Sequence, residues 1–254
     1  MLAALLAWAS LATADETCDD RGVVLQVLGS GGPIADDGRS SAAYLVWHQG
    51  KSRVMVDTGG GAFLRFGEAG ASFDELDYIA ISHFHTDHSA DLVTFLKTGN
   101  FSSRERPLGL SGPSGAGPFP SLDSYLASMI GEGGAYAYLS GYLDGSGGLV
   151  KLEATTVDSS ARDSREVYSG SDVTITGTGV PHGIVPAIAY RVEVDGREMV
   201  FASDQNGNDE QFIDFARNAD VLVMHMVVPE NVAGAGRALH APPSRIGEIA
   251  AAAN

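Results

Sequence analysis

The stretch Tyr78-Ile79-Ala80-Ile81-Ser82-His83-Phe84-His85-Thr86-Asp87-His88 decides the fold prediction. It begins with a run of apolar residues, which predicts a short buried β-strand. Three histidines and one aspartate then follow within six residues. Imidazole nitrogens and carboxylate oxygens are both good zinc ligands. The stretch therefore predicts a metal site at the end of a strand.

The spacing of these polar side chains suits two metal ions. In extended backbone His83 and His85 project to the same face, so they can hold one ion together. Residues 90–96 then carry apolar side chains at helical spacing. Where the chain turns into this helix, Asp87 and His88 point elsewhere and can hold a second ion. The chain has only seven histidines, so three in one short segment argue against a coincidental polar loop.

The rest of the chain contains two groups of short apolar strands. The first group is residues 23–28, 42–47, 53–56 and 78–81, and the second is 173–176, 187–194, 198–202 and 221–224. Helical spacing is found at 209–217 and 244–252. Two groups of strands with helices after them predict a layered α/β sandwich. The segment 111–148 is rich in Gly, Ser and Pro, and we expect a surface insertion with a short helix at 122–130.

The segment from His83 to His88 resembles the HxHxDH signature of the metallo-β-lactamase superfamily. Upstream, Asp57-Thr58-Gly59 resembles the Asp-x-Gly element that precedes the metal loop in this family. Residues 29–33 (GSGGP) with 39–41 (RSS) resemble the opening of its RNA-processing (tRNA 3′-processing endonuclease-like) and arylsulfatase-like branches. The resemblance covers residues 23–252, apart from the Gly-rich segment. It implies an αββα sandwich of two mixed β-sheets flanked by helices.

The resemblance also implies six side chains as ligands of two zinc ions. His83, His85 and His182 would hold the first ion, Asp87 and His88 the second, and Asp204 would be shared between them. His182 follows Val180-Pro181, and Asp204 follows an apolar strand. Taken as residues alone, His182 can also be a plain loop histidine, and Asp204 can cap the turn at 206–208.

One expected ligand is missing from the second site. In the RNA-processing and sulfatase-like branches, a last histidine lies on a strand after the final helix, but this sequence stops at Asn254, directly after that helix. His240 resembles instead the histidine that opens the helix and assists the leaving group. Either the sequence is truncated before its last strand, or His240 is itself the second-site ligand. We expect truncation, a weakly held second zinc and a His240 that does not bind metal.

His225 lies near the His-Glu-Ala-Thr element of the family. The register differs by one position, and the glutamate is absent. Because the His–Glu pair belongs to tRNA 3′-end processing, this departure argues against that activity. We expect His225 to support the core or the metal ligands.

The resemblance implies a zinc-dependent hydrolase in which a metal-bridging hydroxide attacks the substrate. Asp87 would orient this hydroxide, and His240 would give a proton to the leaving oxygen. We expect a sulfate ester or a phosphodiester as the substrate. The alternatives are a hydrolase of β-lactams or of other esters and lactones, a mononuclear iron dioxygenase, and a degenerate metal-binding module.

The charge of the chain bears on its partners. Its formal net charge is −16, from 32 acidic and 16 basic residues. A nucleic-acid-binding protein needs a basic surface, since phosphate contacts dominate its affinity. We therefore expect a small-molecule substrate and no nucleic-acid partner, and the sequence leaves an oligomer open.

The N-terminal residues bear on location. Residues 1–14 form an apolar run that ends in Ala12-Thr13-Ala14, which is typical of a signal peptide. No Lys or Arg precedes the run, so a loose N-terminal helix is the alternative. The run is too short to span a bilayer. We expect an exported protein, periplasmic or extracellular, with one domain over residues 15–254.

Overall fold

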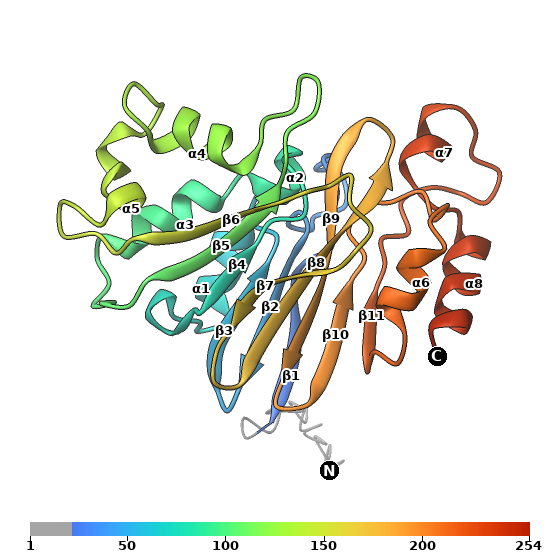
Figure 1. The fold of residues 1–254 in the computed structure, drawn as a ribbon, viewed down its shortest axis with the longest axis horizontal. Helices are drawn as coiled ribbons and strands as arrows, with labels where there is room; N and C mark the ends of the chain where they lie inside the picture. Colours follow the sequence, from blue (N-terminus) through green and yellow to red (C-terminus); the bar gives the residue numbers. More distant parts are fainter. Residues whose placement is uncertain (1–21) are drawn as a thin grey trace, which may run out of the picture.

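Two mixed β-sheets form the centre of this protein in a computed structural model that describes residues 22–254 (Figure 1). The signal peptide expected at residues 1–14 lies outside the described residues. The first sheet has the order β1-β2-β3-β4-β5-β6, with β1 Val23–Gly29, β2 Ala43–His48, β3 Lys51–Val56, β4 Tyr78–Ala80, β5 Leu108–Pro113 and β6 Leu152–Val157. The second has the order β11-β10-β9-β8-β7, with β7 Arg165–Ser169, β8 Val173–His182, β9 Val185–Val194, β10 Arg197–Phe201 and β11 Val221–Val223. Strands β3 to β6 are parallel, as are β10 and β11, whereas the other neighbours are antiparallel.

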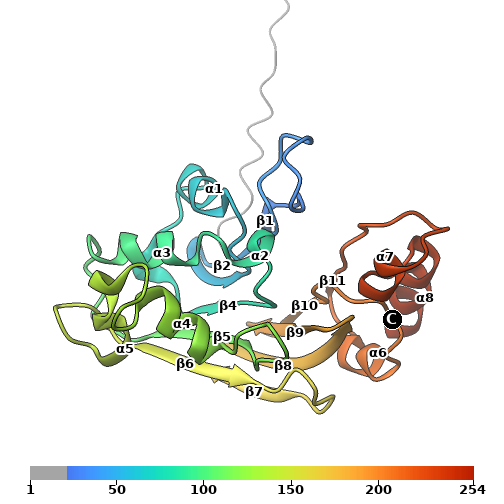
Figure 2. The ribbon, with the colours of Figure 1, turned by 90° about the horizontal axis from the view of Figure 1, so that it is seen from above.

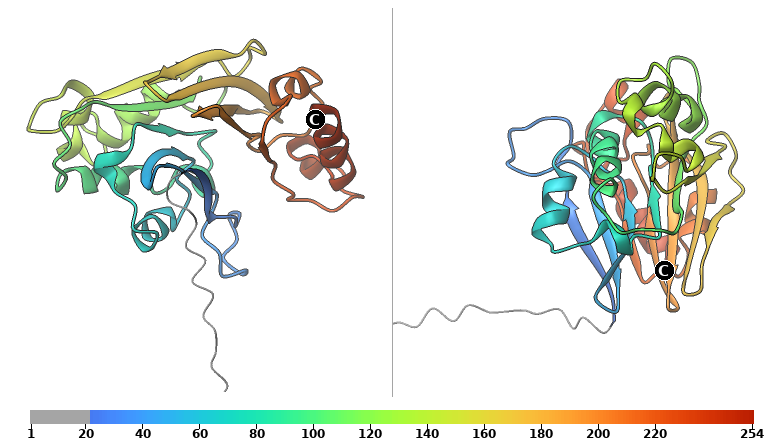
Figure 3. Two further views of the ribbon diagram at one scale, coloured as in Figure 1. Left: turned by 90° about the horizontal axis from the view of Figure 1, so that it is seen from below. Right: turned by 90° about the vertical axis from the view of Figure 1, so that its left-hand side faces the viewer.

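Helices lie outside the two sheets, as the view from above in Figure 2 shows. On the side of the first sheet are α1 Ala62–Glu68, η1 Phe73–Glu75, α2 Thr86–Ser89, α3 Leu92–Gly99, α4 Leu122–Ile130, η2 Ala137–Leu139 and α5 Gly141–Asp144. On the side of the second are α6 Gln211–Ala216, α7 Ala235–Leu239 and α8 Pro243–Ala253 (Figure 3). The predicted αββα sandwich is confirmed. No helix within the described part of the chain is both long and apolar enough to cross a membrane.

Alternating side chains along the strands create three separate cores. In β4, Ile79 packs with the helices of the first sheet, whereas Tyr78 and Ala80 face the second sheet. In β9, Ile188 faces the first sheet, whereas Ala189 packs against α6 and α8. Successive side chains of a strand point to opposite faces, so a strand with apolar residues at every position is covered on both sides. This arrangement fixes the two sheets face to face.

The Gly-rich segment differs from its expected role as a surface insertion. Its first residues belong to β5, which ends at Pro113. The helix expected at 122–130 is present as α4, and its Leu122, Leu126 and Ile130 are buried in the core of the first sheet. A composition rich in Gly, Ser and Pro concealed both the strand and the buried face of the helix. Strands β5, β6 and β7 were not predicted from the sequence.

An ion-pair network ties the two sheets together at the end where the β9–β10 hairpin turns. Asp172, just before β8 in the second sheet, accepts hydrogen bonds from Arg53 Nη1 of β3 (3.0 Å) and from His48 Nδ1 of β2 (3.1 Å). The hydrogen bond from Arg53, with one from Ser171, lowers the pKa of Asp172 to about 2. The Asp195-Gly196 turn beside it has positive φ at both residues, 50° and 72°, as a two-residue type I′ hairpin turn requires.

We expect Asp172→Asn to lower the free energy of unfolding by about 1 kcal/mol at pH 7, because this ion pair is partly exposed. The pKa of Asp172 is about 2 in the folded protein against an ordinary 3.8. Its contribution is therefore complete above the ordinary value and is lost as the pH falls toward the folded value. Urea unfolding should show a smaller difference between variant and wild type at pH 3 than at pH 7, and an equal difference would contradict the assignment.

Candidate metal centre

The candidate metal ligands lie at the ends of strands from both sheets. The segment from His83 to His88 follows β4, and His182 is the last residue of β8. Asp204 follows β10 by three residues, and His240 lies between α7 and α8. All of these strand ends meet at one edge of the sandwich, where α2 lies in Figure 1. Side chains far apart in sequence therefore form one cluster.

The loop after β3 packs against the segment from His83 to His88, called the metal loop below. Asp57 has a φ of 58°, a left-handed conformation that is rare for a residue with a Cβ. Thr58 N–H donates a hydrogen bond to the carbonyl of His88 (2.8 Å). A Cβ on Gly59 would lie 2.1 Å from the carbonyl oxygen of Asp87, so only glycine fits there. The Asp-x-Gly element thus has a packing role against the metal loop.

Hydrogen bonds to the outer ring nitrogens orient two of the histidines. His88 donates from Nδ1 to the carboxylate of Asp57 (2.7 Å), which also accepts bonds from the N–H and hydroxyl of Ser82. His182 donates from Nδ1 to the carbonyl of Leu239 (2.9 Å). In both rings Nε2 is left to face the centre of the cluster. Such partners fix the tautomer and direction of a metal-binding imidazole.

Three sets of potential ligand atoms lie close enough to hold an ion. Within the described residues they are His83 with His85 and His182, His83 with His88 and Asp204, and His182 with Asp204 and His240, each with ligand atoms within 4.8 Å of one another. His182 Nε2 and His240 Nδ1 are buried and have no hydrogen-bond partner. Buried polar atoms are rarely left unpaired. A divalent cation bound by imidazole and carboxylate would satisfy His182 Nε2, so the residues fit a metal.

Asp204 lies at the centre of the cluster. Its Oδ2 is 3.7 Å from His88 Nε2, 3.8 Å from His182 Nε2, 3.8 Å from His240 Nδ1 and 4.0 Å from His83 Nε2. The preceding Ser203 has a φ of 59°, which changes the direction of the chain after β10. This second left-handed residue beside the site stores backbone strain where the aspartate must be placed.

Burial and neighbouring charges set the protonation of these groups. Burial lowers the pKa of His83 well below its usual value and that of His182 to about 4, so both rings are neutral, which is the form that binds metal. Burial also lowers the pKa of His88, but the charge and hydrogen bond of Asp57 outweigh it and raise this pKa to about 9. Burial raises the pKa of Asp204, but the hydrogen bond from His225 and the nearby histidines lower it further, so the carboxylate stays ionised.

Five of the six ligands predicted from the sequence lie in the cluster, whereas Asp87 lies beside it. His83, His85, His88, His182 and Asp204 come together as expected. Asp87 contacts the cluster through His88, with its Oδ2 3.7 Å from His88 Nε2, and none of the three sets within residues 22–254 contains it.

His240 lies at the entrance of α8, as the sequence predicted. Its Nδ1 nevertheless lies as close to Asp204 Oδ2 as His182 Nε2 does. Its side chain is 14% exposed, compared with 1% for His182. His240 is thus the member of its set that is open to an approaching molecule.

Sequence reasoning missed two groups that support the ligands. Ser82 holds the carboxylate of Asp57, and its position directly before His83 was the available signal. Tyr44, in β2, contacts His225 and carried no sequence signal, because the contact spans 181 positions of the chain.

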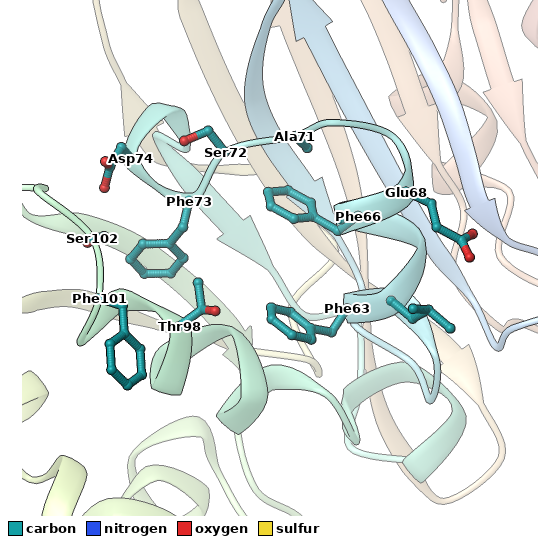
Figure 4. Close-up of a pocket in the computed structure, with 12 residues that line it drawn as sticks. Phe63, Phe66, Glu68, Ala71, Ser72, Phe73, Asp74, Thr98, Phe101 and Ser102 are labelled. Carbon is teal, nitrogen blue, oxygen red and sulfur yellow. The ribbon is translucent and has the colours of Figure 1, made fainter.

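A wide apolar pocket of about 740 Å³ lies away from the metal cluster, between α1, η1 and the end of α3 (Figure 4). Phe63, Phe66, Phe73 and Phe101 line it. None of the cluster residues lines this pocket, so it is separate from the metal cluster.

Relatives of this chain were found by sequence. Ribonuclease Z of Mycobacterium bovis (strain BCG / Pasteur 1173P2) is 28% identical over 215 residues, which cover 82% of this chain and 71% of the relative. Ribonuclease Z of Lachnospira eligens is 35% identical over 91 residues, which cover 36% of this chain and 30% of the relative. The expectation of no nucleic-acid partner is therefore wrong, since these relatives are ribonucleases. The net charge misled because it sums the whole surface, whereas substrate recognition is local.

Solved structures and a family model agree with the fold. The metallo-beta-lactamase fold protein YhfI of Bacillus subtilis has a TM-score of 0.68 at 20% identity, covering 91% of this chain and 81% of that one. Human tRNase Z, short form, has a TM-score of 0.67 at 17% identity, covering 90% and 88%. The model of the metallo-beta-lactamase superfamily matches residues 36–211. With its histidine–aspartate cluster, the chain therefore belongs to the metallo-β-lactamase superfamily and is a metal-dependent hydrolase.

Proposed function

We propose that this chain is a zinc-dependent phosphodiesterase whose substrate is RNA. The observation that carries the proposal is the convergence of three imidazole nitrogens, from His83, His88 and His182, on one oxygen of Asp204, at 3.7 to 4.0 Å. This arrangement suits two cations that share a carboxylate, and paired cations clamp the attacking and leaving oxygens of a phosphodiester. The ribonuclease Z relatives support RNA as the source of that phosphodiester.

Two zinc ions are the proposed cofactor. His83, His85 and His182 would hold one ion, His88 and Asp87 the other, and Asp204 both. Histidine and carboxylate ligands suit zinc. When bound, the ions supply Lewis-acid polarisation and lower the pKa of a bound water.

The chain's own residues then handle position and protons. Asp57 and the Leu239 carbonyl fix the rings of His88 and His182, so the ligands need little rearrangement when metal enters. His240 is partly open to the outside of the cluster. A neutral His240 can take the proton of the attacking water and pass it to the leaving oxygen. The hydroxyl of the water then bonds to phosphorus, and its proton ends on the leaving group.

We expect His83→Ala to abolish metal binding and hydrolysis, because His83 belongs to two of the three ligand sets. Asp204→Ala should lose at least one metal ion and most of the rate, since two cations would face each other without their shared negative charge. Metal content by atomic emission, measured together with rate, checks both variants.

The matched control is His48→Asn, a histidine outside the cluster whose Nδ1 contact with Asp172 an asparagine can reproduce. This variant should keep its metal and its rate. Full activity in His83→Ala, or in metal-free protein, would contradict the proposed centre.

The substrate is tested with a panel of four compounds. We expect cleavage of a precursor tRNA with a 3′ trailer, because the ribonuclease Z relatives outweigh the missing glutamate beside His225, and of bis(p-nitrophenyl) phosphate. Rates should be well below these for p-nitrophenyl sulfate and for a chromogenic β-lactam. A preference for the sulfate ester would overturn the phosphodiester assignment. Hydrolysis of the small phosphodiester without any cleavage of RNA would overturn the RNA assignment alone.

The variant His240→Ala tests whether His240 is a proton donor or a metal ligand. We expect kcat to fall by about 10²- to 10⁴-fold, the usual contribution of a general acid or base, while zinc content stays unchanged. Measured metal stoichiometry and kcat of the purified variant check this. A loss of metal in His240→Ala would place His240 among the ligands.

A further inference from the structure

The second oxygen of the Asp204 carboxylate is held on the side away from the four imidazoles. Asp204 Oδ1 accepts a hydrogen bond of 2.7 Å from His225 Nδ1. His225, two residues after β11, is largely buried, with 15% of its side chain exposed. Its other ring nitrogen, Nε2, lies 2.8 Å from the hydroxyl of Tyr44. Three side chains therefore form one chain of hydrogen bonds: Tyr44, His225 and Asp204.

The direction of these hydrogen bonds follows from the groups involved. An ionised carboxylate only accepts, so His225 Nδ1 carries the proton of that bond. Burial raises the pKa of Tyr44, so its hydroxyl keeps its proton and can donate it to Nε2 of the ring. Each member has a single role that agrees with its neighbour, so the chain fixes the tautomer of His225 as well as its position.

The ring of His225 is also fixed by packing. It stacks on Tyr44 with centroids 5.9 Å apart and an angle of 20° between the planes. Tyr44 is 5% exposed and contacts Phe201 at the end of β10, with centroids 5.5 Å apart. Tyr44 belongs to the first sheet and His225 to the second, so the link spans the sandwich. The ring of His225 is therefore held from the opposite sheet by one hydrogen bond and one stacking contact.

We propose that His225 is a positioning residue that limits Asp204 to one oxygen, Oδ2, as its metal ligand, with Tyr44 holding His225 in place. This inference rests on the metal centre of the proposed function. A carboxylate free to rotate can offer both oxygens to one ion and leave the other without its shared ligand. With Oδ1 occupied by His225, Oδ2 alone is directed at the ring of imidazole nitrogens. The one-oxygen bridge is thus set before metal enters.

Two amide variants of the same position separate the two contacts of His225. The amide nitrogen of asparagine can take the place of Nδ1, so His225→Asn keeps a donor to Asp204 and loses the contact with Tyr44. The amide nitrogen of glutamine can take the place of Nε2, so His225→Gln keeps a partner for Tyr44 and loses the donor to Asp204. Tyr44→Phe, which keeps the ring, removes only the hydroxyl.

The measurements are zinc titrations of metal-free protein by calorimetry and the absorption spectra of the cobalt-substituted forms. For His225→Gln we expect the affinity for the second zinc equivalent to fall about 10- to 100-fold, the usual effect of removing a partner of a ligand. The cobalt spectrum should change with it. His225→Asn should stay within a few-fold of wild type, and Tyr44→Phe should lie between the two. The thermal midpoint of each metal-free protein serves as the control for folding.

The outcomes separate this inference from the metal centre itself. Equal zinc affinities in His225→Gln, His225→Asn and wild type would overturn the role of His225 and leave the centre intact. A fall of the same size in both amide variants would also overturn it, because the donor to Asp204 would then not be what matters. Should both amide variants fail to fold, an unchanged second affinity in Tyr44→Phe would overturn it. Wild-type protein that binds no zinc would overturn the centre and the inference together.

Discussion

The buried carboxylate of Asp204 is the constraint on which the rest of the site depends. An ionised group so far from water is stable only when it is paired and hydrogen-bonded. Its partners come from β4, β8 and β11 and from the chain between α7 and α8, so none of these segments can be placed independently. Without metal, the histidines of the cluster and His225 stabilise this charge; with metal, His83, His88 and His182 would become ligands, while His225 would keep its hydrogen bond to Asp204. The sandwich therefore brings side chains from four segments to one carboxylate.

The backbone strain that accompanies this arrangement is concentrated at the strand ends. Asp57 and Ser203, both with left-handed backbone and both buried, stand where β3 and β10 stop. Such residues persist only when the surrounding structure over-determines them. Here the three cores do so, because the central strands, such as β4 and β9, are covered on both faces and cannot slip by one residue without disrupting the packing of their apolar side chains. The rigid sheets therefore stabilise the strained residues at the strand ends, where the metal cluster lies.

The sequence was informative where chemistry is local and uninformative where it depends on tertiary contacts. The HxHxDH spacing predicted His83, His85 and His88 directly, because neighbouring residues share a strand end. His182 and Asp204 were identified only by resemblance, since a single histidine or aspartate at a strand end has no distinctive pattern. Tyr44 was not predictable at all, because its role arises from one hydrogen bond between the sheets. Strand β5 was missed because its Gly, Ser and Pro residues are typical of a loop, although the strand is fully buried. Strands β6 and β7 were missed because they carry charged and polar residues and are only partly buried.

The acidity of the chain and a phosphodiester substrate are compatible once distance is considered. The net charge of −16 is spread over the surface of the whole protein. Salt screens exposed charges beyond about 8 Å at physiological ionic strength, so most of that charge does not act at the metal cluster. At the cluster itself, the carboxylates are Asp57, Asp87 and Asp204, and neutral imidazoles supply the other ligands. Two divalent ions carry more positive charge than these three carboxylates carry negative. The occupied centre would therefore attract a phosphate even though the protein as a whole repels it, and its rate should depend on metal occupancy more steeply than on bulk charge.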